Sequence, residues 1–369
     1  MKFTCEKNQL VTAASVASRT VAQKSAIAGL EGIFVRAGVK VQLTGYNLET
    51  GITVTMDAAV QETGACIMPA RLFFDIIRKL PDDTVSIQVD ENYKVNIRGG
   101  ISSFTITALS AEDYPELPDV DSEKGIRVPQ CELKAMISGT IFAVSENQAR
   151  PIHTGVLFEV DETSITSVAV DGYRLALRRY TPDEKLDRTL KFVAPAAALK
   201  EVEKILGDTE EAATFYPGSK HILFSIGEAT LVCRILEGEF LDWRRVLPQN
   251  NPVKLVGNVS QLTDSIERVS LVISEKLKSP VRCKFGDNTA EFRTVSTIGE
   301  AYDVCPIAGD GKDLEIGFNC RYLLDALRAV PDSECTLEMI NGLSPIVLNP
   351  TQGDRYSYMV LPVRLKAGE

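Results

Sequence analysis

The two histidines are the first candidates for chemistry, because a neutral imidazole can act as a general base near pH 7. They are His153 and His221, and His153 is followed by the carboxylates Glu159 and Asp171. A base beside carboxylates could abstract a proton, which leaves an enzyme on a repeated α+β scaffold as an alternative function. A histidine near carboxylates is more often structural than catalytic. Two histidines also exclude a histidine-rich metal site.

The eight cysteines are the next candidates, since thiolates bind metals and act as nucleophiles. They stand singly, with no Cys-x-x-Cys pair, at positions 5, 66, 131, 233, 283, 305, 320 and 335. This spacing favours reduced structural thiols over a zinc site or a redox pair. We therefore expect no metal and no cofactor.

Two glycine- or acid-rich segments resemble binding loops only in part. The segment 309–312, Gly-Asp-Gly-Lys, ends like a phosphate loop, but Pro306 takes the place of the first glycine and Asp313 that of Ser or Thr. We expect an ordinary loop there. The segment 119–123 begins like a calcium loop, yet Lys124 stands at the required glycine. We expect a solvated linker, and with no complete catalytic motif in the chain we expect no enzyme.

The composition is that of an ordinary globular protein with two or three domains. The chain has 369 residues, of which 44% are hydrophobic and 24% charged. Its longest apolar runs fall far short of the roughly 20 residues that cross a bilayer, and the start Met1-Lys2-Phe3-Thr4-Cys5 turns polar at once. We expect a cytoplasmic protein with no membrane partner. The net charge of −10 argues against a nucleic-acid partner only if the charge is spread evenly.

Internal similarity indicates three copies of a unit of about 125 residues. The pattern Arg-x3-Asp-x2-Arg-x2-Pro occurs at 71–81 and again at 321–331, and Pro195 marks a middle copy where the first has Pro69. Two further pairs of matching segments are Gly-Tyr-x-Leu at 45–48 and 172–175, and Leu-x-x-Glu at 109–112 and 236–239. Pro, Asp and Asn accumulate between the copies. The predicted domains are 1–121, 125–248 and 253–369.

Each copy contains two amphipathic helical patterns. Leu262, Ile266 and Val269 are spaced by three and four residues, which places them on one helix face. In the same way Leu72 and Ile76 are expected on a buried stripe. The predicted helices are 7–21, 69–80, 131–144, 195–206, 259–273 and 319–330, and alternating segments at 85–89, 93–97 and 104–106 predict strands. The fold class is therefore α+β, with two helices on antiparallel sheet in each copy.

The predicted helices are electropositive in an acidic chain. Together they carry a net positive charge, although the whole chain carries −10. An ordinary solvated helix face is the simpler interpretation of this charge distribution. The pattern also suits a protein that presents helices to a polyanion at close range, because exposed charges are screened beyond about 8 Å at physiological salt.

Several segments, in this order and spacing, resemble one family over the whole chain. They are the start Met1-Lys2-Phe3-Thr4, the segments 68–75 (MPARLFFD), 169–175 (AVDGYRL), 237–248 (EGEFLDWRRVLP) and 317–325 (GFNCRYLLD), and the end 358–365 (YMVLPVRL). The sequence is similar to the bacterial DNA polymerase III beta subunits, the beta sliding clamps. This resemblance implies three repeated sliding-clamp domains, a head-to-tail dimeric ring, and helices that line its hole.

The resemblance also implies the function and the partners. A sliding clamp is a non-catalytic processivity factor of the polymerase holoenzyme in DNA replication. It encircles double-stranded DNA without sequence specificity, as a homodimer. Its implied partners are the DNA polymerase III alpha subunit, the clamp loader, and other polymerases and repair proteins that carry clamp-binding peptides. A dimeric peptide-binding scaffold that never encircles DNA stays open as a third class.

The resemblance places a hydrophobic peptide-binding pocket between the second and third domains. The matching residues are His153, Val170, Gly172, Tyr173, Arg174, Leu175, Leu241, Arg245, Val246, Asn319, Tyr322, Met359, Val360, Leu361, Pro362, Val363 and Arg364. Leu241 stands where better-known members carry Pro, and His153 replaces an apolar residue. The segment 361–363 also suits a C-terminal edge strand, where Pro is tolerated. We expect a polar tail after it, at 366–369.

The resemblance names two further surfaces. Its implied DNA contacts are Lys24, Arg71, Asn147 and Arg150, whereas Ala196 and Ala197 occupy the positions of a basic pair that is usual in the family. The implied dimer interface consists of Phe104 and Ile106 from the first domain and Leu271 and Val272 from the third. These four apolar side chains could equally belong to the cores of their own domains.

Overall fold

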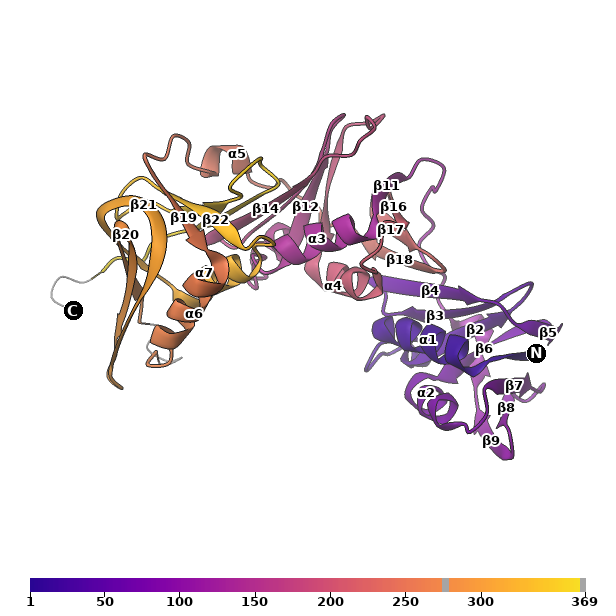
Figure 1. The fold of residues 1–369 in the computed structure, drawn as a ribbon. Coiled ribbons are helices and arrows are strands. Elements are labelled where there is room, and N and C mark those ends of the chain that lie inside the picture. The colour runs from indigo at the N-terminus through magenta and orange to yellow at the C-terminus, as the bar shows by residue number, and fades with distance from the viewer. Residues whose placement is uncertain (274–278, 366–369) are drawn as a thin grey trace. The chain divides into compact units, whose positions relative to one another are not determined.

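The computed structural model describes residues 1–273 and 279–365, so the tail predicted at 366–369 lies outside the described residues. The chain forms two compact units, Met1–Leu133 with Lys200–Ile235 and Lys134–Leu199 with Leu236–Glu369. Each contains antiparallel sheet with short helices (Figure 1). The helices α3 (Gln130–Ile141) and α4 (Ala196–Ile205) have residues in both units. None of the helices in the described part of the chain is long and apolar enough to cross a membrane.

The first unit holds two sheets. A five-stranded sheet has the order β5-β1-β7-β8-β9, and a nine-stranded sheet has the order β10-β6-β2-β3-β4-β18-β17-β16-β11. The strands are β1 (Lys2–Glu6), β2 (Gly32–Ala37), β3 (Val41–Tyr46), β4 (Thr50–Met56), β5 (Ala59–Glu62), β6 (Gly64–Pro69), β7 (Thr84–Val89), β8 (Lys94–Gly99), β9 (Ser102–Thr107), β10 (Leu109–Ser110), β11 (Ile126–Pro129), β16 (Ala212–Pro217), β17 (His221–Ile226) and β18 (Ala229–Arg234). The pair β4 and β18 joins strands of the first and second repeats in one sheet.

Helix α1 (Lys7–Ala17) packs on β4 and on α2 (Ala70–Lys79). It is shorter than the predicted helix 7–21, because a 3-10 turn follows in which the Ser18 hydroxyl donates to the Ala14 carbonyl (2.6 Å). In α2 the side chains of Phe73, Ile76 and Ile77 are buried, as the pattern predicts. Leu72 is 49% exposed, so its predicted place on the buried stripe is wrong.

The second unit holds one ten-stranded sheet in the order β15-β12-β13-β14-β24-β23-β22-β19-β21-β20. The strands are β12 (Gly155–Val160), β13 (Ile165–Val170), β14 (Arg174–Tyr180), β15 (Leu190–Pro195), β19 (Val253–Asn258), β20 (Val281–Val295), β21 (Glu300–Phe318), β22 (Glu334–Met339), β23 (Ile346–Asn349) and β24 (Tyr356–Val360). The pair β14 and β24 joins strands of the second and third repeats.

Two capped helices cover part of this sheet. Helix α6 (Val259–Ser270) packs on β20, β21 and α7 (Cys320–Arg328), and α7 also packs on β24. The side chains of Asn258 and Asn319 accept hydrogen bonds from amides in the first turn of α6 and α7, which is the usual work of an N-cap asparagine. The short helix α5 (Trp243–Val246) was not predicted, since four residues carry no helical period.

The turns of the β3–β4 and β13–β14 hairpins show how the first two repeats align. The Asn47 side chain accepts from the amides of Glu49 (3.0 Å) and Thr50 (2.8 Å), and Asp171 does the same for the two residues at the equivalent places. The residue after each is left-handed, Leu48 with φ 73° and Gly172 with φ 92°. Asn47 therefore corresponds to Asp171, and the predicted match of 45–48 with 172–175 is wrong by three residues.

The predicted match of 109–112 with 236–239 is confirmed. Leu109 pairs with Ile67, two residues before Pro69. The amide of Leu236 donates to the carbonyl of Val193 (2.9 Å), again two residues before a proline that ends a strand. Leu109 and Leu236 therefore bond to equivalent positions on the edges of two equivalent strands, β6 and β15.

The glycine-rich segment 309–312 is not the loop that we predicted but part of β21. Its pairing with β20 shifts register on both sides of Asp287, so extra residues of β21 are inserted as bulges. The bulged backbone is left-handed at Gly309 (φ 117°), Lys312 (φ 55°) and Asp313 (φ 55°). The acidic segment 119–123 lies in a stretch without helix or strand, as expected for a linker.

Candidate peptide-binding site and DNA-facing residues

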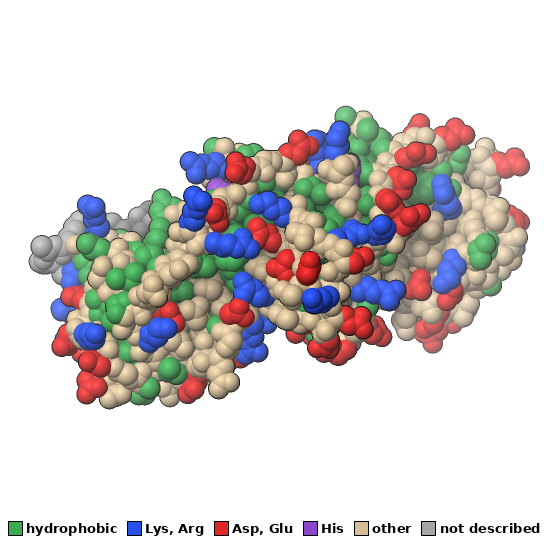
Figure 2. Space-filling model, turned by 90° about the horizontal axis from the view of Figure 1, so that it is seen from above, with side chains coloured by type: hydrophobic (Ala, Val, Ile, Leu, Met, Phe, Trp, Pro, Cys, Tyr) green, Lys and Arg blue, Asp and Glu red, His purple; other side chains and the backbone are tan. Residues whose placement is uncertain are grey.

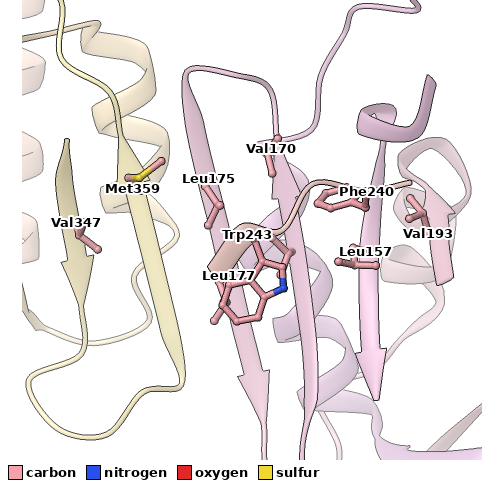
Figure 3. Close-up of a cluster of buried hydrophobic side chains, with 10 residues drawn as sticks. Leu157, Val170, Leu175, Leu177, Val193, Phe240, Trp243, Val347 and Met359 are labelled. Atoms are coloured by element: carbon pink, nitrogen blue, oxygen red, sulfur yellow. The ribbon is translucent and has the colours of Figure 1, made fainter. Parts of the chain in front are cut away.

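A cluster of buried apolar side chains lies on one face of the ten-stranded sheet, and we call it the apolar cluster (Figure 3). Its members come from β12, β13, β14, β15, β23, β24 and the segment before and within α5. They are Leu157, Val168, Val170, Leu175, Leu177, Val193, Phe240, Trp243, Val347 and Met359. Half-buried side chains pack against it, among them Leu241 and Leu361. The cluster therefore combines strands of the second and third repeats.

Strand alternation and the β13–β14 turn bring these side chains together. Leu175 and Leu177 are two residues apart and so point to the same face of β14. Met359 lies opposite Leu175 in the β14–β24 pair. Gly172 in the turn has open space where a Cβ would stand, so the backbone is accessible there. The turn thus presents its backbone beside the cluster.

Aromatic and aliphatic side chains form the edge of the cluster. Tyr173 is 61% exposed and its ring stacks on that of Tyr322 from α7, with centroids 6.0 Å apart. The amide of Leu361 donates to the carbonyl of Tyr173 (2.9 Å), and that of Val363 to Gly317 (2.8 Å). Since β24 ends at Val360, the segment 361–363 is not the edge strand that was the alternative interpretation. It is a strap, and the half-buried side chain of Leu361 in it packs against the cluster.

A buried arginine lies beneath the stacked tyrosines. Arg174 is 7% exposed and donates from Nε to Asp171 (2.9 Å) and from Nη1 to Asp325 on α7 (2.6 Å). Its guanidinium lies 4.5 Å from the centre of the Tyr322 ring. A buried charge is tolerated only when it is paired in this way. Arg174 therefore ties β14 to α7 and supports Tyr322 from below.

Asn319 has a structural role that the sequence did not predict. Its side-chain oxygen accepts from the amides of Arg321 (3.0 Å) and Tyr322 (3.4 Å). The side chain is thereby committed to the start of α7, which carries Tyr322. Of the other predicted residues, Arg245 and Arg364 are exposed, Val246 is 43% exposed and Pro362 is half-buried.

Sequence reasoning missed several members of the apolar cluster, above all Phe240 and Trp243. Both are 5% exposed and both belong to the segment 237–248 that carried the family resemblance. Figure 3 shows them on the chain that crosses the strands bearing Leu157 and Leu177. Two large aromatic residues in a polar stretch rich in Glu and Arg were the available signal, because such residues are expected to be buried.

His153 is not placed as a catalytic base. It lies in a 3-10 turn and makes an edge contact with the Phe240 ring at 5.4 Å. Burial lowers the pKa of His153, and the charge of Arg150 lowers it further. In the described residues Glu159 bonds to Trp243 and Arg244, while Asp171 bonds to its own turn and to Arg174. The carboxylates of the enzyme alternative are thus committed elsewhere.

The predicted DNA contacts are all exposed. Lys24 follows the 3-10 turn after α1, Arg71 lies in the first turn of α2, and Asn147 and Arg150 lie after α3. The Asn147 side chain accepts from the amide of Ala149 (2.9 Å), which shapes that loop. Figure 2 shows Lys and Arg side chains interspersed with Asp and Glu on the face in view. A polyanion contact made by these four predicted residues would be local and salt-sensitive.

The predicted interface residues are at least partly exposed. Leu271 after α6 is 82% exposed and Phe104 on the edge strand β9 is 39% exposed, while Ile106 and Val272 are half-buried. The alternative that Phe104 and Leu271 belong to the cores of their own domains is therefore wrong. The exposed side chains of Leu271 and Phe104 are accessible to another chain.

The cysteines fit the structural interpretation. All eight are free thiols in the structure, and all except Cys131 are buried. Burial raises the pKa of Cys5, Cys66, Cys233 and Cys335 to about 12, so these thiols stay protonated and unreactive. In the described part of the chain no three His, Cys, Asp or Glu residues are grouped as metal ligands.

Comparison with known proteins finds matches to one family along the whole chain. Family models of the DNA polymerase III beta subunit match its N-terminal domain at residues 1–118, its central domain at 127–242 and its C-terminal domain at 244–364. The beta sliding clamp of Staphylococcus aureus is 30% identical over 377 residues, which cover 99% of each chain.

Solved structures agree with the sequence relatives. A putative DNA polymerase III beta subunit from Eubacterium rectale superposes with a TM-score of 0.94 at 32% identity, and the DNA polymerase sliding clamp from Bacillus subtilis with 0.94 at 29%. Each comparison covers 99% of this chain and 100% of the other. The three repeats, the antiparallel sheets with paired helices and these matches show that the chain belongs to the family of DNA polymerase III beta subunits, the beta sliding clamps.

Proposed function

We propose that the chain works as a sliding clamp: a closed ring of two copies that encircles duplex DNA and tethers a polymerase and other replication proteins. The observation that carries this is the apolar cluster, which residues of the second and third repeats build together, with the half-buried side chain of Leu361 packed against it and the exposed ring of Tyr173 two residues before its member Leu175. Tethering raises the effective concentration of the polymerase at the primer end, so the clamp needs no reaction of its own.

The cluster suits a short peptide with two or three apolar anchors. Leu and Phe side chains of such a peptide would be desolvated against Leu241, Leu361 and the cluster beneath them. The open backbone at Gly172 and the exposed Arg245 offer hydrogen bonds that would orient the peptide chain. We propose that the DNA polymerase III alpha subunit, the clamp loader, other polymerases and repair proteins dock here in turn, through peptides such as Gln-Leu-x-Leu-Phe.

DNA binding is proposed to be weak, non-specific and topological. Lys24, Arg71, Asn147 and Arg150 would meet phosphates without reading base edges. The predicted domains 1–121, 125–248 and 253–369 would repeat around each half of the ring, and we propose a cytoplasmic location. Phe104, Ile106, Leu271 and Val272 would close the ring head to tail.

The decisive experiment uses a nicked circular plasmid onto which the protein has been loaded by a clamp loader of a related bacterium. A ring should remain on the circle through gel filtration in high salt and should leave once the plasmid is cut to a linear form. A scaffold that never encircles DNA would leave both forms equally fast. Stimulation of a polymerase on primed circular DNA, without turnover by the protein alone, would support the tethering role.

A further inference from the structure

We propose that Glu159 is a positioning residue of the peptide site: through the Trp243 indole and the Arg244 guanidinium it fixes the segment 237–247, which carries Leu241, Arg245 and Val246. This inference rests on the proposed peptide-binding function. Glu159 itself lies under the segment and is not proposed to touch the peptide.

The position of Glu159 in the sheet is unusual for a carboxylate. In β12 it stands two residues after Leu157, so both side chains point to the face that carries the apolar cluster. The Glu159 side chain is 18% exposed, and its partners on the two neighbouring strands are Thr166 and Lys191. Burying a carboxylate costs free energy unless donors satisfy it. The groups that donate hydrogen bonds to the Glu159 carboxylate therefore indicate its structural role.

Two of those donors come from α5. The Trp243 indole Nε1 donates to Glu159 Oε2 at 3.1 Å, and Arg244 Nη2 lies 2.8 Å from the same oxygen. The Arg244 guanidinium also lies 4.1 Å from the centre of the Trp243 ring. Lys191 on the neighbouring strand lies 3.9 Å from the other oxygen. One carboxylate thus fixes the rotamers of two consecutive residues.

Other restraints on the crossing segment are mostly local. They include the backbone hydrogen bond of Leu236 to Val193 at its start, those of Arg245 and Leu247 within the one-turn helix α5, and the pair of Asp242 with Arg245 Nε at 3.0 Å. The N-cap residue Asp242 makes no side-chain capping bond. Side chains must therefore hold the segment on the sheet, and Phe240 and Trp243 are its buried anchors.

Of these two anchors only Trp243 has a polar group that sets direction. Phe240 can rotate or slide within an apolar contact, whereas the bond from Nε1 to Glu159 fixes both the depth and the angle of the indole. Leu241 precedes Trp243 by two residues and Val246 follows it by three. A shift of the indole would therefore displace the part of the site that this segment supplies.

The test compares peptide affinity with the fluorescence of Trp243, the only tryptophan in the chain. Glu159→Leu keeps a side chain of similar size on the face that carries the apolar cluster and should fold, but it removes the acceptor. We expect about tenfold weaker binding of a labelled Gln-Leu-x-Leu-Phe peptide, and a shifted tryptophan emission without peptide, because a charge-assisted bond is lost. Glu159→Gln keeps an acceptor and should stay within about threefold of the unchanged protein.

Glu338→Leu is the matched control. Glu338 in β22 is 16% exposed and binds Asn251 at 3.0 Å and Lys254 at 3.2 Å, and both of these partners in the described structure lie outside the segment 237–247. This variant should leave peptide affinity and tryptophan emission unchanged. If Glu159→Leu does not fold, Trp243→Phe removes the donor together with the second ring of the indole and should weaken the peptide at least as much.

The outcomes distinguish failure of the proposed peptide site from failure of the proposed role of Glu159. Failure of the unchanged protein to bind the peptide would overturn the proposed peptide site itself. Normal peptide binding by Glu159→Leu, or weakened binding with an unchanged emission spectrum, would overturn the role of Glu159 alone. Should Trp243→Phe be the variant in use, wild-type affinity would overturn it as well.

Discussion

At the scale of single residues, the peptide site depends on two kinds of side chain. Buried charged side chains are paired with opposite charges, and apolar side chains at the surface remain accessible to a peptide. Arg174 shows the first kind, with two carboxylates and an aromatic ring around one guanidinium. Leu361 and Val363 show the second, since their amides are bonded while their side chains are half-buried or exposed. Truncating the second kind should remove binding and leave the fold intact.

The double variant Leu361→Ala with Val363→Ala tests this directly. It should weaken the Gln-Leu-x-Leu-Phe peptide at least tenfold, because two apolar contacts worth about 1 to 3 kcal/mol each are lost. Dimer formation and salt-sensitive DNA association should persist. Calorimetric titration of peptide, with sedimentation as the control, measures both. Deleting Met359–Glu369 is a poorer test, since Met359 and Val360 are buried in β24. Unaltered peptide affinity would mean that the site lies elsewhere.

His153 makes the stability of the fold depend on pH. Its pKa in the folded protein is below the ordinary value of 6.5, so the unfolded chain takes up the proton first as pH falls. The stability contributed by neutral His153 is present above about pH 6.5 and is lost as pH falls through the lowered pKa. Denaturant titrations should show a shallower loss between about pH 7 and 5 for His153→Gln. A folded-state pKa above 6.5 by NMR would contradict this.

At the scale of elements, the start of α7 links helix stability to the site. The Asn319 cap holds the turn that carries Tyr322, and Tyr322 in turn stacks on Tyr173. The same device starts α6, where Asn258 accepts from the amide of Gln261 (3.0 Å), far along the chain from the peptide-site residues of α7. The two caps therefore form a natural pair for comparison.

Asn319→Ala and Asn258→Ala should each lower the free energy of unfolding by about 1 kcal/mol, the usual value of an asparagine N-cap. Only Asn319→Ala should also weaken the peptide, by a few fold, because its turn supports Tyr322. Urea unfolding measures the free energy of unfolding of each variant, and peptide titration measures its peptide affinity. Equal peptide affinities for the two variants would show that the cap has a structural role only.

The sequence predicted the elements better than their ends and their details. Helical periodicity placed α1, α2, α3, α4, α6 and α7, because buried apolar stripes are long enough to be seen. It did not reveal the bulges in β21, where register is set by pairing with β20. Nor did it reveal Glu159 and Trp243, since a carboxylate and an indole so far apart in the chain meet only through the fold. Matching letters at 45–48 and 172–175 misled because the turn geometry, not Tyr46, is what repeats.

At the scale of the whole molecule, the proposed ring depends on small apolar surfaces. Leu271 and Val272 follow the end of α6, and Phe104 lies on the edge strand β9, whose outer side has unpaired backbone groups in the described chain. Exposed strand edges and exposed leucines favour association with another chain. A second copy that presents the complementary surface would cover both.

Changing Leu271 to Ala and Val272 to Lys should release monomers. The pair removes apolar area and places a charge without a partner in the interface, a change that costs several kcal/mol when the charge is buried. Sedimentation velocity at micromolar concentration should show the mass of one chain, and loading on circular DNA should be lost. Peptide binding should persist, because each copy contains its own site. A dimer that survives this change would refute the interface assignment.

The strand pair β4 with β18 has a consequence for any attempt to divide the chain. Thr50–Val54 and Ala229–Cys233 pair in one ladder, so the first repeat shares a sheet with the second, and β14 with β24 repeats the arrangement for the third. Cutting the exposed segment around residues 119–124 with a protease would sever the covalent connection but leave this ladder in place. The two fragments should co-elute as one particle. Expressed alone, the first repeat would expose the unpaired backbone N–H and C=O groups of β4 at the edge of its sheet and should aggregate.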